Sequence, residues 1–178
     1  MKTRVLLVTL LLPFMMVTAF SQVDAAPVDQ KLSHNLYIIF DASGSMFQID
    51  CSGGQRKIKV AKEAIITFLA KVPPQFNLGL HVFDEKGSRE IYPLGNINRQ
   101  ELVDKVKNIR AGGKTPLCAA IDASRKALLK QKQKQLGYGE YTMLIVTDGE
   151  ANRKQALPSF VQKATDEGFV VQVIGFCP

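Results

Sequence analysis

The stretch LYIIFDASGSM, residues 36–46, decides the expected fold. Its first half, residues 36–40, is continuously apolar and rich in aromatic and β-branched side chains, as in a buried strand of a parallel sheet. Three hydrogen-bonding side chains, Asp41, Ser43 and Ser45, follow at once. Because ligands of open α/β sheets bind at the carboxyl ends of the strands, these three residues are candidates for a binding site.

The three hydrogen-bonding side chains of this stretch offer only oxygen. A carboxylate and two hydroxyls suit a hard cation such as Mg²⁺, Mn²⁺ or Ca²⁺. Alone, the Asp-x-Ser-x-Ser pattern is equally typical of a polar turn in which Asp41 and Ser43 bond backbone groups. Two later residues favour the cation. Thr115 follows a Gly-Gly-Lys loop at the predicted start of a helix, and Asp148 ends a second apolar strand predicted over residues 141–147.

These separated motifs resemble the metal-ion-dependent adhesion site of von Willebrand factor type A (VWA) domains. Their order and their positions at element ends match from about residue 35 to the last residue. The resemblance implies an α/β fold, a Rossmann-like three-layer sandwich. Its central sheet is mostly parallel with one antiparallel edge strand, and helices cover both faces. It also implies that five residues hold the metal: Asp41, Ser43, Ser45, Thr115 and Asp148.

Such a site would leave a divalent cation electrophilic and with an open coordination position. The resemblance implies that an Asp or Glu of a partner protein fills this position, with Mg²⁺ as the expected ion and Mn²⁺ or Ca²⁺ as alternatives. We therefore expect metal-dependent protein recognition rather than an enzyme. A metal-dependent hydrolase stays open as an alternative, although no general base is evident. A structural domain of the same fold without metal is the other alternative.

The first 25 residues have the pattern of a secretory signal peptide. Lys2 and Arg4 precede a long apolar run, and the small residues Ala25 and Ala26 flank the expected cleavage position. An uncleaved membrane anchor is the alternative, because the apolar run is only just shorter than a spanning helix. We expect a secreted or periplasmic protein with no membrane span after cleavage. Its expected parts are a signal peptide (1–25), a lead-in segment (26–34) and a VWA domain (35–178).

The remaining helices and strands follow from hydrophobic periodicity and from caps. Asn98 and Glu101 resemble a capping box, and Thr115 with Pro116 is predicted to cap and begin a helix. His81 is expected to be a packed strand residue. The helices are predicted over 58–72, from 98, from 115 and over 157–167, and the further strands over 76–84, 89–94 and 170–176. VWA domains usually continue with another helix, so the resemblance implies a short version or a fragment whose last strand is poorly covered.

The charge and the cysteines limit the partners and the compartment. A formal charge of +7 favours acidic proteins, anionic glycans or membrane surfaces. Nucleic acid is not expected, because no nucleic-acid-binding motif is present. The cysteines, Cys51, Cys118 and Cys177, all fall near the predicted ligand edge. A Cys51–Cys118 disulfide would fasten the first loop of an exported protein, but three pairings are possible and a buried thiol remains the alternative for Cys118.

Overall fold

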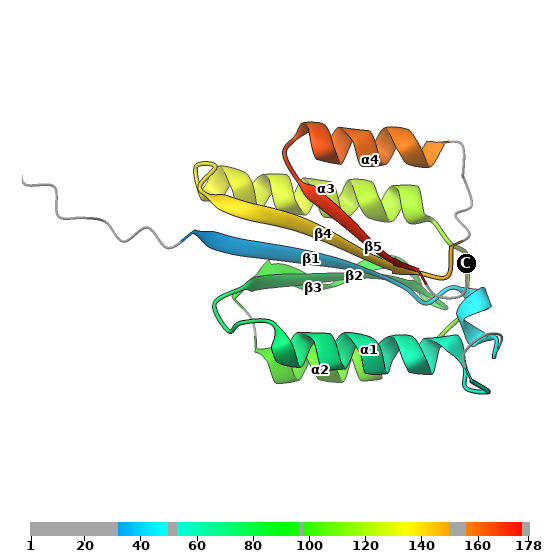
Figure 1. Ribbon diagram of the computed structural model, residues 1–178. Coiled ribbons are helices and arrows are strands. Elements are labelled where there is room, and N and C mark those ends of the chain that lie inside the picture. Colours follow the sequence, from blue (N-terminus) through cyan, green and yellow to red (C-terminus); the bar gives the residue numbers. More distant parts are fainter. Residues whose placement is uncertain (1–31, 50–52, 97, 150–155, 176–178) are drawn as a thin grey trace, which may run out of the picture. The chain divides into compact units, whose positions relative to one another are not determined.

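The computed structural model describes residues 32–49, 53–96, 98–149 and 156–175. They form a five-stranded sheet in the order β3-β2-β1-β4-β5, with helices on both faces (Figure 1). The strands are β1 (Ser33–Asp41), β2 (Asn77–Asp84), β3 (Gly87–Gly95), β4 (Gly139–Thr147) and β5 (Val170–Gly175). The helices are the short 3₁₀ helix η1 (Gly44–Phe47) and the α-helices α1 (Lys57–Lys71), α2 (Arg99–Lys107), α3 (Leu117–Lys134) and α4 (Leu157–Asp166).

The pairing of the strands confirms the predicted fold class. β1 pairs in parallel with β2 and β4, and β4 pairs in parallel with β5. β3 is antiparallel to β2 and lies at the sheet edge. A turn as short as the one joining β2 to β3 permits only an antiparallel pair. β1 starts at Ser33, so Ser33 and His34 belong to the strand and not to the lead-in segment in which we placed them.

Alternating side chains of β1 build the two halves of the core. Leu36, Ile38 and Phe40 are buried among residues of α1 and α2. Tyr37 and Ile39 are buried against α3 and α4, which cover the other face. A strand enclosed on both faces reads as an unbroken apolar run, as this one does. Because β1 is the central strand, the polar residues that follow it lie at the middle of the sheet edge.

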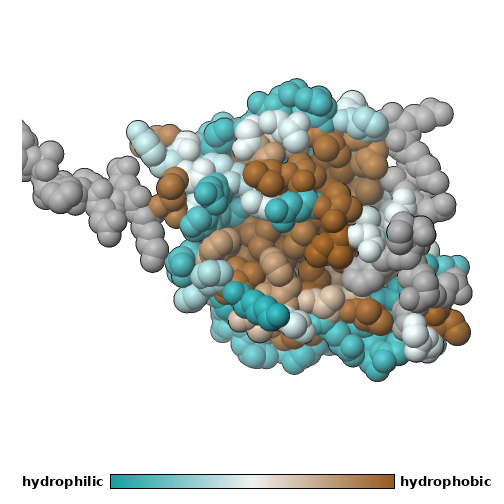
Figure 2. Space-filling model, in the orientation of Figure 1, coloured by the Kyte–Doolittle hydropathy of each residue, from teal (hydrophilic) through white to brown (hydrophobic). Residues whose placement is uncertain are grey.

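The last strand is exposed. Val170, Val173 and Ile174 of β5 expose 52%, 62% and 41% of their surface. Figure 2 shows apolar surface over the face where β5 lies. The prediction that the last strand is poorly covered is therefore confirmed for its described residues. No helix in the described ranges is both long and apolar enough to cross a membrane.

His81 is expected to make the fold sensitive to acid. It is buried in β2, as predicted, and one ring nitrogen (Nε2) lies 2.8 Å from the Ser88 hydroxyl. Burial, and secondarily the charge of Arg89, lower the pKa of His81 to about 4. Between about pH 6.5 and 4 the unfolded chain therefore binds a proton that the folded chain does not. Unfolding free energy should fall by about 3 kcal/mol across that interval because of this residue alone.

Urea unfolding of the wild type and of His81→Gln at several pH values tests this. The difference in unfolding free energy between the two proteins should shrink as the pH falls towards 4 and then level off. Parallel pH profiles would contradict a buried neutral His81.

Candidate metal centre

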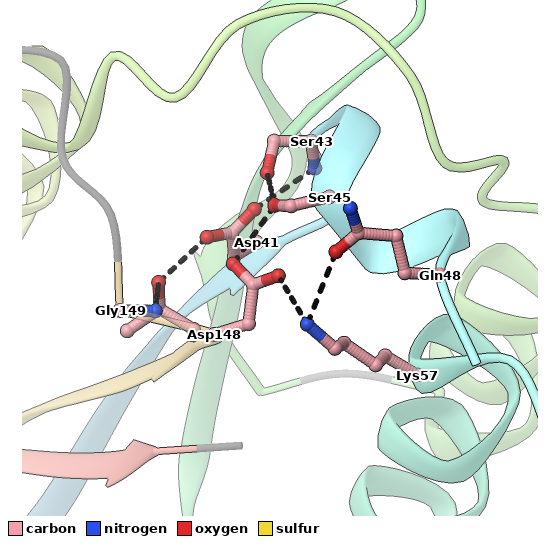
Figure 3. Close-up of polar contacts among 8 residues, drawn as sticks. Asp41, Ser43, Ser45, Gln48, Lys57, Asp148 and Gly149 are labelled. Atoms are coloured by element: carbon pink, nitrogen blue, oxygen red, sulfur yellow. Dashed lines mark hydrogen bonds and ion pairs between the residues drawn. The ribbon is translucent and has the colours of Figure 1, made fainter. Parts of the chain in front are cut away.

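Four of the five predicted ligands meet at one edge of the sheet. β1 and β4 are parallel neighbours in register, with Phe40 opposite Val146, so their carboxyl ends coincide. Asp41 ends β1, and Asp148 directly follows β4. Ser43 and Ser45 lie on the turn and the 3₁₀ helix after β1. In Figure 3 the polar atoms of these four side chains converge on one another.

The converging oxygens have the spacing of ligands around one small cation. The hydroxyl oxygens of Ser43 and Ser45 are 3.1 Å apart, and the Ser45 hydroxyl donates to Oδ1 of Asp148 at 3.0 Å. Oxygens that share an octahedral Mg²⁺ shell, at about 2.1 Å from the ion, lie about 3 Å from their neighbours. Ser43 also makes no side-chain bond to the start of η1, which leaves its hydroxyl facing Ser45. The geometry therefore fits a hard divalent cation.

Asp41 is held firmly at the base of this cluster. It is fully buried, and its Oδ1 accepts from the Ser43 amide at 2.8 Å. Its Oδ2 accepts from the Thr147 hydroxyl at 2.6 Å. Burial raises the pKa of Asp41; the hydrogen bonds from Ser43 and Thr147 partly offset this, and the charge of Asp148 adds to it. The polar turn considered as an alternative thus exists, but it engages the amide of Ser43 and leaves the serine hydroxyls to the cluster.

Asp148 has a second neighbour that we did not predict. Nζ of Lys57 lies 3.4 Å from Oδ2 of Asp148 and 3.4 Å from Oε1 of Gln48 (Figure 3). The side chains of Lys57 and Asp148 are only 8% and 3% exposed. The pair is therefore a buried ion pair in which each charge depends on the other. One oxygen of Asp148 faces the hydroxyl cluster and the other faces the ammonium group.

Sequence reasoning missed Lys57 and Thr147, although each left a signal. Lys57 is the first residue of α1, where a positive charge opposes the helix dipole and no acidic residue accompanies it. A lysine at such a position suggests a partner carboxylate elsewhere. Thr147 directly precedes Asp148 at a strand end, so its hydroxyl lies at the edge where the ligands gather.

Thr115 does not cap a helix, which corrects our prediction. α3 begins at Leu117, with Pro116 at the cap position, and the Leu117 amide donates to the Thr115 carbonyl oxygen at 2.9 Å. The preceding loop is fastened beside the cluster, because the Gly44 amide donates to the Gly113 carbonyl at 3.2 Å. Thr115 is buried, and among the described residues no hydrogen bond joins its hydroxyl to the other four predicted ligands.

The donor set decides which metals the centre suits. Within the described ranges, no group of three or more His, Cys, Asp or Glu side chains is placed to hold a metal. The cluster instead combines two carboxylates, Asp41 and Asp148, with serine hydroxyls. Oxygen donors of this kind favour hard cations over soft ones. The residues present therefore fit Mg²⁺, Mn²⁺ or Ca²⁺.

The predicted disulfide falls mostly outside the described residues. Cys118 is buried in the first turn of α3, whereas Cys51 and Cys177 lie outside the described ranges. The pairing of the cysteines stays a prediction.

Comparison with known sequences identifies relatives of the chain. The sequence model for the von Willebrand factor type A domain matches residues 35–177. A protein of Bacillus subtilis named uncharacterized protein YwmD is 26% identical over 163 residues, which cover 83% of this chain and 70% of that protein.

Solved structures share the fold at low sequence identity. Manganese-loaded TRAP of Plasmodium vivax has a TM-score of 0.64 at 23% identity, covering 81% of this chain and 57% of that one. Proximal thread matrix protein 1 of the mussel byssus, with zinc in its MIDAS motif, scores 0.64 at 16% identity, covering 81% and 38%. A von Willebrand factor type A structure from Catenulispora acidiphila scores 0.62 at 21% identity, covering 80% and 33%. The chain thus spans less than two thirds of each of these solved chains.

Proposed function

The chain belongs to the von Willebrand factor type A domain family, and from this premise we propose that it binds a divalent cation and recognises a partner protein through it. The proposed ligands are the residues predicted from the sequence: Asp41, Ser43, Ser45, Thr115 and Asp148. Mg²⁺ is the proposed ion, with Mn²⁺ or Ca²⁺ as substitutes. The partner would contribute an Asp or Glu side chain.

One observation carries the proposal. The hydroxyl oxygens of Ser43 and Ser45 are 3.1 Å apart, and the Ser45 hydroxyl oxygen is 3.0 Å from Oδ1 of Asp148. Neighbouring ligands of one small ion have this spacing. Two proteins of the same fold support it, since TRAP of Plasmodium vivax is manganese-loaded in its crystal structure and proximal thread matrix protein 1 has a zinc-occupied MIDAS motif.

The residues of the centre determine what a bound cation would do. Asp41 is fixed by Thr147 and the Ser43 amide, and Asp148 by Ser45 and Lys57, so the carboxylates are positioned before any cation arrives. Two carboxylates and neutral hydroxyls leave the ion electrophilic, and it would supply an open position for a carboxylate oxygen. A partner's acid suits that position because a carboxylate oxygen is a hard donor of the kind these cations prefer.

We propose recognition rather than catalysis, and a location outside the cytoplasm. The proposal of recognition is supported by the donor set: in the part of the chain that the structure describes, no third acidic or imidazole side chain joins Asp41 and Asp148 in a metal-binding group. The location rests on the signal-peptide pattern of residues 1–25, which lie outside the described ranges. The signal-peptide prediction itself stays a proposal.

Saturating Mg²⁺ or Mn²⁺ should raise the melting temperature of the chain purified without residues 1–25. Binding to the folded state alone at about 100 times the dissociation constant adds about 2.7 kcal/mol, or about 5–10 °C for a domain of this size. Asp148→Asn should abolish the shift, because it removes a charged ligand while keeping the shape of the side chain. Differential scanning fluorimetry with and without chelator measures both.

Asp166→Asn is the matched control. It removes the same charge from the exposed end of α4, where Asp166 accepts from the Gln162 side-chain amide and, among the described residues, from no other group. The control should keep the whole cation-dependent shift. A shift of the same size in Asp148→Asn would show that the cation binds elsewhere.

A further inference from the structure

A basic cleft of ≈ 630 Å³ lies at the carboxyl end of β2. Its walls come from α1, from the turn between β2 and β3, and from the end of α2 with the loop that follows. Its cationic side chains are those of Lys62, Lys86, Arg89, Lys107 and Arg110. We call this site the basic cleft.

The acidic residues of the cleft do not balance these cations. Asp84 is already neutralised by Arg89, whose guanidinium donates to both carboxylate oxygens at 2.6 and 2.9 Å. Burial and this ion pair hold Arg89 and Asp84 together, so neither contributes net charge to the cleft. Glu85 is the one other acid among the described residues of its lining. Lys107 is paired with Asp104 at 3.5 Å. A single unpaired carboxylate among the described lining residues therefore faces three cations, Lys62, Lys86 and Arg110. This leaves a net positive site.

Like charges are held close together in the cleft. Nζ of Lys62 donates to the Lys107 carbonyl oxygen at 2.8 Å, which fixes the ammonium group against the wall. Partial burial, and next the charge of Arg110, lower the pKa of Lys62. An anion between Lys62 and Arg110 would relieve this repulsion, so the arrangement favours an acidic ligand.

One loop joins the basic cleft to the metal centre. Residues 108–110 line the cleft, and residues 112 and 113 of the same loop form hydrogen bonds with residues 42 and 44, beside the candidate ligands. The Gly112 amide donates to the Ala42 carbonyl oxygen at 2.8 Å, and the Gly44 amide donates to the Gly113 carbonyl oxygen at 3.2 Å. Cleft and centre are therefore joined through this loop near the carboxyl ends of β1 and β2. Figure 1 shows that these two strands run side by side and end at the same edge of the sheet.

We propose that the basic cleft binds a second acidic side chain of the same partner segment whose first carboxylate reaches the cation. This proposal rests on the proposed function, because the metal centre fixes one end of the segment. An acidic protein segment fits better than a sulfated glycan, since the neighbouring centre requires a carboxylate on a projecting side chain. The cleft would select partners with paired acidic residues and would speed their association.

Binding of a synthetic peptide that alternates Glu and Gly tests the proposal, measured by biolayer interferometry in Mg²⁺. The double variant Lys86→Ala/Arg110→Ala should bind about tenfold more weakly, because it removes two exposed charges of the cleft that no described carboxylate pairs. Its cation-dependent melting shift should stay intact. The control Lys130→Ala/Lys134→Ala removes two exposed charges near the far end of α3 and should bind as the wild type does.

The outcomes separate this proposal from the proposed function. Weaker binding in both Asp148→Asn and the cleft variant supports the two-point contact. If only Asp148→Asn loses peptide binding, the proposed role of the basic cleft is wrong and the proposed metal function stands. If only the cleft variant loses peptide binding, the result contradicts the proposed metal function and with it the two-point contact. If the cleft variant loses binding to heparin but not to the peptide, the cleft is a glycan site and the proposal is wrong.

Discussion

Replacing Lys57 with methionine is expected to lower the free energy of unfolding by about 3–5 kcal/mol in chelator-treated buffer. The methionine keeps most of the side-chain volume but removes the ammonium group 3.4 Å from Oδ2 of Asp148. Asp148, with a side chain only 3% exposed, would then carry an uncompensated buried charge. Such a charge costs more than the ion pair itself contributes, which explains the large expected effect.

A divalent cation should recover part of this loss. In the Lys57→Met protein the charge of Asp148 would be balanced by the cation alone, so the stabilisation gained on adding Mg²⁺ should exceed that of the wild type. Urea unfolding with Mg²⁺ and with chelator gives the four free energies needed. The difference between the stabilisation that Mg²⁺ gives to Lys57→Met and the stabilisation that it gives to the wild type measures the coupling between Lys57 and the cation.

Lys59→Met is the matched control for this experiment. Lys59 lies on the same helix and its side chain is 62% exposed, with Glu63 as an ion partner at 4.0 Å. An exposed pair of this kind contributes little, so the control should change stability by less than about 1 kcal/mol and leave the Mg²⁺ response unchanged. Equal losses in the two variants would contradict a buried partnership of Lys57 with Asp148. Lys57→Arg keeps the charge, so its free energy of unfolding should lie between those of the wild type and Lys57→Met.

The fold was predictable because it depends on patterns that survive in a single sequence. The run 36–40 is apolar on both sides of the strand, and only a strand covered on both faces of a sheet needs that. The cap at Asn98 was predictable as well, because capping is local: its side chain accepts from the Gln100 and Glu101 amides. The start of β1 at Ser33 was not predictable, since its first residues are polar and gain their partners from β4.

The site was predictable only where chain order fixes position. Asp41 and Asp148 each end an apolar run, and the ends of parallel neighbours must meet. Lys57 reaches Asp148 through the tertiary packing of α1, which no local pattern encodes. Thr115 was misread for the opposite reason. Its local pattern predicts a cap, but the loop before it is tied to residues 42–44, and the helix starts later at Leu117.

Replacing Gly113 with alanine is the other change expected to have a large effect. Gly113 has a φ of 77°, a conformation that side-chain-bearing residues rarely adopt. An added Cβ would lie 2.6 Å from the backbone carbonyl oxygen of Asp84, which cannot rotate away. Backbone strain and the clash together should cost about 2–5 kcal/mol of unfolding free energy.

Gly113→Ala should also weaken cation binding, which distinguishes a displaced loop from backbone strain that affects stability alone. Gly113 accepts the Gly44 amide and lies two residues before Thr115, so a displaced loop would weaken cation binding as well as the fold. Gly137→Ala is the control: its φ of 83° is similar, but nothing lies within 4 Å of its added Cβ. That variant should lose about 1 kcal/mol and keep its full Mg²⁺-dependent melting shift. If the two variants lose the same stability and respond equally to Mg²⁺, then the loop before Thr115 does not position the centre. Thr115 would in that case have to be removed from the proposed ligands.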